Sequence, residues 1–460
     1  MTIENTATER IVAIVEAQRD FFRSGATLGY EFRKKQLQRL QKALQKWAKP
    51  LCEALWADLH KSEQEAILTE LSIVDGEVKN HLRHLKGWMK SERRSTPLKM
   101  MPSRSRIVSE PLGQSLIISP WNYPVQLLLN PLVGAISAGC TAVLKPSPYV
   151  PNVSKTIELM IAETFEEKYV AVVQGNRDVN TALLEQRYDI IFFTGSPSLG
   201  KLVMAAAAKN LTPVVLELGG KSPCIVDKSA DIAIAAQRIA WGKTLNAGQT
   251  CIAPDYLLIH HSKQAEFVEE FKKAVKRLHG DDVRQSKHFV RLVNERAFDR
   301  VAAYLNDGKV VAGGHIVREE RYIEPTLLAD VSPISPVMQE EIFGPVLPMI
   351  TFDKREEVVR FVTEREKPLA FYYFGKEDKA WKMIRHTSSG GACINDTIMH
   401  IANENLPFGG VGNSGMGSYH GRVSFDAFSH RRAVVITPSW LDLPFRYMPY
   451  KMFGLVKKLL

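Results

Sequence analysis

The most reactive side chains of this chain lie between Glu217 and Cys251. The stretch begins Glu-Leu-Gly-Gly-Lys-Ser-Pro and ends Asn-Ala-Gly-Gln-Thr-Cys. The thiolate is the nucleophilic form of cysteine, and a carboxylate in reach can act as a base in the same reaction. Small residues before Cys251 would leave the thiol accessible and expose backbone N–H groups to a developing oxyanion. On spacing alone, the alternative is a small buried cysteine and a surface carboxylate.

Composition limits the classes of protein to which the chain belongs. It has 460 residues, 45% hydrophobic residues and a net charge of +10, which is typical of a globular protein of roughly two or three domains. No basic run with interleaved aromatic residues occurs in the central region, so we predict no nucleic-acid partner. Five cysteines without C-x-x-C spacing favour a reducing compartment. No signal peptide or membrane span is recognisable, so we expect a cytoplasmic protein. We predict no metal site.

The elements that must position the reactive residues follow a regular rhythm. Residues 4–93 have apolar side chains three or four apart, which predicts amphipathic helices, and we assign them no chemistry. From Gln114 onward, short apolar runs alternate with helical stretches, which predicts parallel strands joined by right-handed crossovers. Ligands of such a doubly wound sheet bind at the carboxyl ends of its strands. The apolar runs lie at 115–119, 141–144, 169–173 and 189–193.

Several predicted strand ends carry polar residues. Asn122, in Pro-Trp-Asn-Tyr-Pro, offers amide donors at a rigid corner. Lys145 follows the second run, although a lone lysine there is more often a solvated charge. The turn from Gly195 to Gly200, with Ser196, leads into a helix and would present N–H groups to a phosphate. The G-x-G-x-x-G pattern is missing, so a plain strand-to-helix turn is the alternative.

A second α/β set follows Cys251, with apolar runs at 256–260, 346–351, 369–374 and 391–394. Within it, the tight turn Glu-Ile-Phe-Gly-Pro places Glu341 and Phe343 two residues apart. The alternative is a helix end with Phe343 in the core. Residues 406–417 are so rich in glycine that we expect a loop crossing close to other backbone or to a ligand.

Two segments lack a core of their own. Residues 95–112, with three prolines, predict an extended hairpin or arm, and a mobile surface loop is the alternative. The run at 433–437 also has the pattern of a strand. Because such arms often pair with another chain, we expect both segments to pair across the subunits of a homodimer.

Together these motifs, in order and spacing, resemble the aldehyde dehydrogenase superfamily over nearly the whole chain. The segments at 248–256 and 415–421 are most similar to the class 3 branch, which includes fatty and aromatic aldehyde dehydrogenases. The resemblance rests on Pro-Trp-Asn at 120–122, Lys-Pro-Ser at 145–147, the Gly195 and Gly200 turn, Glu-Leu-Gly-Gly-Lys at 217–221, Gly-Gln-Thr-Cys at 248–251, Glu-Ile-Phe-Gly-Pro at 341–345 and Pro-Phe-Gly-Gly at 407–410.

The resemblance implies a fold and a set of domains. The fold would be two doubly wound Rossmann-like α/β domains with a small β oligomerisation arm. The cofactor-binding domain would comprise 1–94, 113–216 and 411–428, and the catalytic domain 217–410. The arm would comprise 95–112 and 429–441, followed by a tail at 442–460.

The resemblance also implies roles for individual residues. Cys251 would be the nucleophile, Asn122 an oxyanion donor and Glu217 the general base, with Glu341 as the runner-up for the base. The reaction would be NAD(P)-dependent oxidation of an aldehyde to an acid through a cysteine thioester. The cofactor would be bound by Lys145 at the adenosine ribose, by Gly195, Ser196 and Gly200 at the pyrophosphate, by Glu341 and Phe343 at the nicotinamide ribose and ring, and by Trp121, Leu218 and Gly219 nearby.

Three further expectations concern specificity. Many NAD-preferring relatives have a glutamate where this chain has Pro148, so we predict that NADP is accepted alongside NAD. The aldehyde is expected to be apolar, aliphatic or aromatic. A coenzyme A acylating enzyme or a non-catalytic protein of the same fold is the alternative. Residues 445–460 alternate apolar and basic character, so weak contact with an anionic membrane surface is a hypothesis, against a solvated or dimer-packed tail.

Overall fold

The apolar spacing before residue 90 produces helices, as predicted. The computed structural model describes residues 3–442, 447–450, 453, 454 and 457. The helices pack their apolar stripes inward, and α1, for example, buries Ile11, Ile14 and Val15. They are α1 (Thr8–Arg23), α2 (Tyr30–Leu59), α3 (Glu63–Ala66), a π-helical turn (Ile67–Leu71) and α4 (Ser72–Trp88).

Six strands form the first sheet, in the order β17-β7-β6-β3-β4-β5. All neighbours are parallel except β17, which is antiparallel to β7. The strand order reverses between β3 and β6, so the loops after these strands diverge and leave room for a ligand. The strands are β3 (Gln114–Ile118), β4 (Thr141–Lys145), β5 (Val170–Val172), β6 (Ile190–Gly195), β7 (Val214–Leu218) and β17 (Gly415–Met416).

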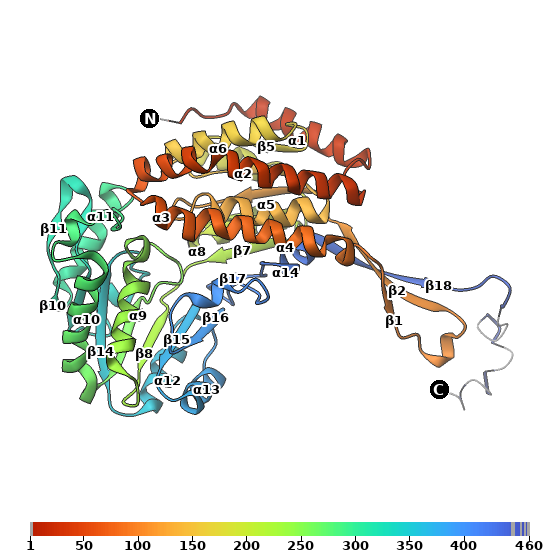
Figure 1. Cartoon of the computed structure of the whole chain (residues 1–460). Coiled ribbons are helices and arrows are strands. Elements are labelled where there is room, and N and C mark those ends of the chain that lie inside the picture. Colours follow the sequence, from red (N-terminus) through yellow and green to blue (C-terminus); the bar gives the residue numbers. More distant parts are fainter. Residues whose placement is uncertain (1–2, 443–446, 451–452, 455–456, 458–460) are drawn as a thin grey trace.

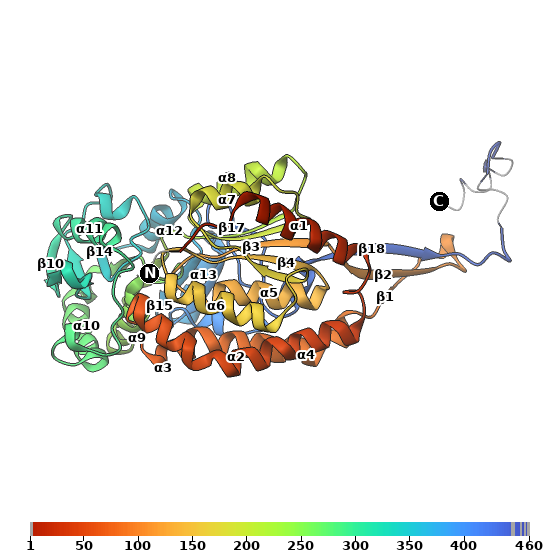
Figure 2. The same cartoon turned by 90° about the horizontal axis from the view of Figure 1, so that it is seen from above.

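Helices cover both faces of this sheet. Alternate strand residues enter different cores, as the two-residue period of a strand requires: Leu116 and Ile118 lie in one cluster and Ile117 in the other. One face carries α5 (Gln126–Ala138) and α6 (Pro151–Thr164), with α2 and α4 outside them. The other face carries α1, α7 (Arg177–Leu184) and α8 (Pro197–Ala208) (Figure 2).

Seven strands form the second sheet, in the order β10-β13-β14-β9-β8-β15-β16, with only β10 antiparallel. The strands are β8 (Pro223–Val226), β9 (Tyr256–His260), β10 (Lys309–Ala312), β13 (Thr326–Ala329), β14 (Val346–Phe352), β15 (Ala370–Phe374) and β16 (Gly391–Ile394). The helices are α9 (Ile232–Thr244), α10 (Gln264–His279), α11 (Glu295–Ala303), α12 (Arg355–Thr363) and α13 (Glu377–His386). A small hairpin joins β11 (Ile316–Val317) to β12 (Tyr322–Ile323).

The two predicted α/β sets are therefore two separate sheets, connected by the turn between β7 and β8 (Figure 1). Because β7 ends at Leu218, the first sheet continues past the predicted border at residue 216. Glu217 thus lies on the first sheet, and the chain enters the second sheet only after the glycine turn.

The predicted arm is a three-stranded antiparallel sheet that projects from the body (Figures 1 and 2). It contains β1 (Glu92–Arg94), β2 (Arg104–Pro111) and β18 (Ser429–Ile436). The two predicted segments pair with each other within the chain, with Ser429 opposite Pro111 and Ile436 opposite Arg104. The outer edges of β1 and β18 are the ones that remain for another chain.

None of the described helices combines the length and apolar character that a bilayer crossing requires. Most of the tail that we considered for membrane contact, residues 445–460, lies outside the described residues.

A buried carboxylate joins the N-terminal helices to the C-terminal segment. Glu77, on α4, is 4% exposed and accepts hydrogen bonds from Gly421 N (2.8 Å), Ser424 Oγ (2.9 Å) and His81 Nε2 (3.0 Å). Burial opposes its ionisation, but the hydrogen bonds from His81 and Gly421 N and the nearby imidazoles of His81 and His420 lower its pKa to about 2. Glu77 therefore fixes the start of α14 (Arg422–Ala427) against α4 and α5.

Replacing Glu77 with Leu should destabilise the protein by about 3 kcal/mol, because buried donors at Gly421 and Ser424 lose their acceptor. Urea unfolding followed by circular dichroism measures the change. The exposed Glu53 on α2 is the matched control, and Glu53→Leu should change the midpoint little. Equal effects of the two substitutions would contradict this assignment.

Candidate active site

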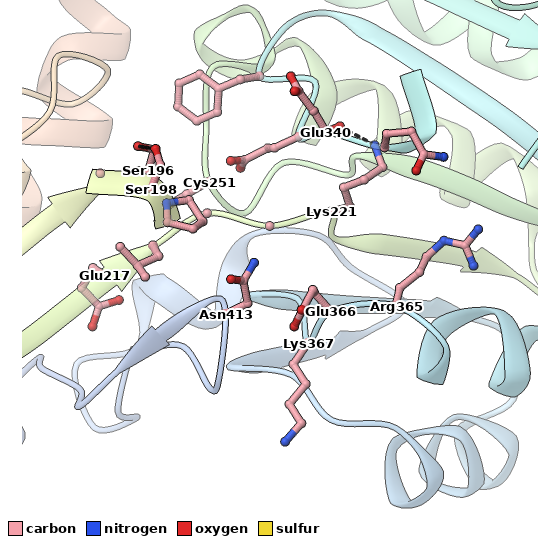
Figure 3. A pocket seen from close by; sticks show the side chains of 18 of the residues that line it. Ser196, Ser198, Glu217, Lys221, Cys251, Glu340, Arg365, Glu366, Lys367 and Asn413 are labelled. Atoms are coloured by element: carbon pink, nitrogen blue, oxygen red, sulfur yellow. Dashed lines mark hydrogen bonds between the residues drawn. The ribbon is translucent and has the colours of Figure 1, made fainter. Parts of the chain in front are cut away.

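A cavity of about 990 Å³ opens between the carboxyl ends of the two sheets, and its walls come from both (Figure 3). This volume is in the range of pockets that hold small molecules and cofactors. The predicted site residues that line it are Trp121, Asn122, Gly195, Ser196, Glu217, Leu218, Gly219, Cys251, Glu341 and Phe343. Two predicted residues, Lys145 and Gly200, are not among the described residues that line it.

An unusual turn directs Cys251 into the cavity. Asn246, Ala247 and Gly248 have φ of 51°, 52° and 72°, so two non-glycine residues are in the left-handed region. A Cβ at Gly248 would lie 2.3 Å from Gly344 O, which requires glycine there. The turn leaves Cys251 half-buried at the cavity wall.

Burial raises the pKa of the Cys251 thiol, and the nearby Glu341 and Glu217 carboxyls raise it further. The backbone N–H groups of Cys251 and Ile252 oppose this shift because they interact favourably with a negative sulfur. At neutral pH the thiol of the ligand-free site is therefore protonated, and the same N–H groups can stabilise negative charge that forms beside it.

Asn122 is held against the cysteine loop. Its side chain is 2% exposed, and its Nδ2 donates to Gln249 O at 3.0 Å. Among the described residues the amide group makes no other hydrogen bond, and its Oδ1 is buried without a partner. Since an amide nitrogen carries two N–H donors, the second one can serve a ligand in the cavity.

Two carboxyl groups flank the thiol from different sheets. Both carboxyl oxygens of Glu217 are buried without a hydrogen-bond partner in the described chain, and burial raises its pKa well above the usual range. Burial and the charge of Asp255 raise the pKa of Glu341 to about 8, although a hydrogen bond from Gly220 N–H acts to lower it. Burial thus favours the protonated form of both carboxyl groups, and each can accept a proton above its raised pKa.

The turn that carries Glu341 is fixed by Lys221 and Arg300. Lys221 forms an ion pair with Asp255 and donates to Val337 O (2.7 Å) and Glu340 O (2.8 Å). Arg300 donates to Glu341 O (3.1 Å). The lysine of Glu-Leu-Gly-Gly-Lys thus positions the second carboxyl group.

Two aromatic rings lie in contact at the cavity wall. The ring centroids of Trp121 and Phe343 are 5.4 Å apart, with the rings nearly perpendicular at 85°. Phe343 is half-buried and has a φ of 49°, which is uncommon for a bulky residue. Phe343 therefore belongs to the site rather than to the core.

The start of α8 offers a place for a phosphate. Ser196 caps the helix by accepting a hydrogen bond from Leu199 N at 3.4 Å, and Thr194 Oγ1 is buried nearby without a partner. Free N–H groups and the helix dipole favour an anion there. Gly200 contributes by packing, since a Cβ would lie 2.7 Å from Leu218 Cδ2. These residues fit the diphosphate of a dinucleotide.

Lys145 lies apart from this cavity. It is 1% exposed, its Nζ donates to Pro146 O at 2.8 Å, and burial lowers its pKa to about 8. A ribose at the end of β4 would have to displace this bond.

The sequence analysis missed three residues that hold the loops of the site in place. Lys61, Glu65 and Glu70 come from the N-terminal helices, to which we assigned no chemistry, and they contact the loops of Asn122 and Cys251. Their spacing is that of an ordinary amphipathic helix. The only local signal is Ser62-x-x-Glu65, which predicts a helix start and no active-site contact.

The family model described as "Aldehyde dehydrogenase family" matches residues 1–434. The chain belongs to the aldehyde dehydrogenase family. It is 45% identical over 434 residues to 4,4'-diaponeurosporen-aldehyde dehydrogenase of Staphylococcus aureus, covering 94% of this chain and 95% of that relative. It is 46% identical over 427 residues to the dimeric NADP-preferring aldehyde dehydrogenase of Mus musculus, covering 93% and 94%.

A solved structure of Staphylococcus aureus AldH in a substrate-bound state superposes with a TM-score of 0.96, at 43% identity, covering 98% of this chain and 99% of that one. The predicted fold and family are thereby confirmed. This aldehyde dehydrogenase is an oxidoreductase that acts on aldehydes, and its family uses NAD or NADP.

Gly219 offers a test of the Glu341 geometry. A Cβ at Gly219 would lie 2.0 Å from Glu341 Oε2, whereas one at Gly220 would meet its nearest atom at 3.4 Å. Gly219→Ala should displace the Glu341 carboxyl and lower kcat/KM for the cofactor about tenfold, because small misplacements are costly in a preorganised site. Gly220→Ala is the control, measured by steady-state kinetics beside thermal unfolding. The geometry is wrong if both variants keep full activity.

Proposed function

We propose that the enzyme oxidises apolar aldehydes to carboxylic acids, with Cys251 as nucleophile and Glu217 as general base. The convergence of Cys251, Asn122 and Glu217 on one cavity supports this proposal. A hydrolytic outcome is favoured over acyl transfer to coenzyme A because a buried carboxyl group beside the thiol can activate water.

In the first step the Cys251 thiol passes its proton to the ionised form of Glu217, and the resulting thiolate sulfur adds to the aldehyde carbonyl; Glu217 releases this proton to solvent before it acts again. The oxygen becomes negative, and the Asn122 amide and the Cys251 backbone N–H stabilise it. A preorganised donor of this kind is worth about 10²- to 10³-fold in rate. The Cys251 N–H already interacts favourably with negative charge at this point of the site.

Glu341 and Phe343 would hold the nicotinamide of NAD or NADP, which would accept the hydride from the carbon, and a thioester would then remain on Cys251. Glu217 then takes a proton from the water that attacks this thioester. Glu341 is the alternative general base. The buried carboxyl of Glu217 has a raised pKa, which makes it a stronger base once it is ionised.

The cofactor is assigned to the wall around α8 and the Trp121–Phe343 pair. Gly195, Ser196 and the helix start would hold the diphosphate, with Gly200 keeping α8 close to β7. Glu341 and Phe343 would hold the nicotinamide ribose and ring, beside Trp121, Leu218 and Gly219. Lys145 would hold the adenosine ribose, which requires its ammonium to leave Pro146 O.

The larger organisation is assigned in the same way. The six-stranded unit would be the cofactor-binding domain, the seven-stranded unit the catalytic domain, and the arm a dimerisation element. A mouse relative is named dimeric, which supports a homodimer. All five cysteines are free, which suits the cytoplasm. Weak membrane contact by the tail is retained as a hypothesis.

Cys251→Ala should abolish reduction of the cofactor by any aldehyde. The absorbance of the reduced cofactor measures this activity. Glu217→Gln should lower steady-state turnover about 10²-fold or more, because water must then attack the thioester without a base. Added hydroxylamine, which needs no such base, should restore turnover in Glu217→Gln but not in Cys251→Ala. In the wild type, deacylation should rise with pH as Glu217 ionises. Full activity of Glu217→Gln would move the role to Glu341.

We further propose that NADP is used alongside NAD, since Pro148 places no carboxylate where a 2'-phosphate would lie. A relative at 46% identity is named NADP-preferring. Pro148→Glu should lower kcat/KM for NADP at least about tenfold relative to NAD through charge repulsion. Pro148→Gln is the control, because it also removes the proline ring but adds no charge. Undetectable activity of the wild type with NADP would refute the proposal.

A further inference from the structure

A fully buried ion pair lies beneath the reactive loops. Lys61, just after α2, and Glu70, in the π-helical turn, are each 0% exposed, and Lys61 Nζ lies 2.6 Å from Glu70 Oε1. Burying such a pair costs desolvation energy that its attraction often does not recover, so fold stability alone does not explain it. π-Helical turns are rare and occur frequently at functional sites.

The pair is bonded to the Asn122 loop. Lys61 Nζ donates to Asn122 O at 3.1 Å and lies 4.3 Å from the centre of the Tyr123 ring. Glu70 Oε2 accepts from Val125 N at 2.8 Å and from Gln126 N at 3.3 Å. The ion pair therefore fixes the Asn122 carbonyl and the backbone at Val125 and Gln126, which follow it in the chain.

The same segment is bonded to the cysteine loop. Glu65 Oε1 accepts from Asn246 N at 2.9 Å, at the start of the left-handed turn. Asn246 Nδ2 in turn donates to Asn122 O (2.9 Å) and Gln249 O (3.1 Å). A left-handed conformation at Asn246 and Ala247 is strained and persists only where surrounding contacts impose it.

We propose that Lys61, Glu65 and Glu70 are positioning residues that set the Asn122 amide and the Cys251 backbone N–H at the spacing required to hold one oxygen. They touch neither the cavity nor the reacting atoms, and they act through Asn122 and the turn at 246–248. This inference rests on the roles proposed above for Asn122 and Cys251.

The test uses the double variant Lys61→Met/Glu70→Gln, which removes the charges without leaving one of them unpaired. Its kcat should fall about 10- to 100-fold, below the full worth of an oxyanion donor. KM for the aldehyde and the Kd of NAD should change less than about threefold, because the lost contact matters only in the transition state. The control is Lys46→Met/Glu163→Gln, the same exchange at an exposed ion pair between α2 and α6, with unchanged kinetics.

Asn122→Ala separates this inference from its premise. If the pair acts through Asn122, the double variant should cost much less in an Asn122→Ala background than in the wild type. Equal losses in both backgrounds would overturn the inference, as would a folded double variant with wild-type kcat. If Asn122→Ala itself keeps full activity, the proposed role of Asn122 fails, and the inference with it.

Glu65 gives a second measurement that does not depend on the ion pair. Glu65→Gln keeps an acceptor for Asn246 N and should retain most of kcat, whereas Glu65→Leu should lose about tenfold or more. Equal kcat values in these two variants, or a loss that follows thermal stability alone, would overturn the role of Glu65.

Discussion

Burial of the Cys251 thiol and of the Glu217 and Glu341 carboxyl groups sets the protonation equilibria on which the chemistry of this enzyme depends. Burial raises the pKa of all three groups, which favours their uncharged forms in the resting site. A low-dielectric setting also strengthens every hydrogen bond offered to a charge that develops during the reaction. The site therefore combines weak charge in the ground state with donors that act on the transition state.

The cavity exists because the two sheets direct the carboxyl ends of their parallel strands at each other. The turn after β7 is short, and the missing side chain of Gly219 leaves room for the Glu341 carboxyl, which comes from a loop of the second sheet. Lys221, in the same turn, fixes the loop of the second carboxyl group. One short turn between the sheets therefore helps to position residues of both sheets around Cys251.

The N-terminal helices complete the arrangement from the side opposite the cavity. Buried Lys61 contacts the backbone of the Asn122 loop, and half-buried Glu65 contacts the left-handed turn before Cys251. A strained turn needs such support, since without it the backbone relaxes to a lower-energy conformation. Residues with no access to substrate are therefore coupled to the position of the reacting groups.

The sequence by itself determined the α/β architecture and the family, and it predicted candidate reactive residues that line one cavity. Strand and helix periods are local properties, and the motifs around Glu217 and Cys251 are contiguous in the chain. Only the tertiary structure decided which charges are buried: Lys61 and Glu70 have the spacing of solvent-exposed helix residues, while Lys145, which resembled a cavity residue, bonds to Pro146 O. Likewise, strand patterns at 105–109 and 433–437 do not specify a partner, and the intrachain pairing of β2 with β18 depends on contacts distant in sequence.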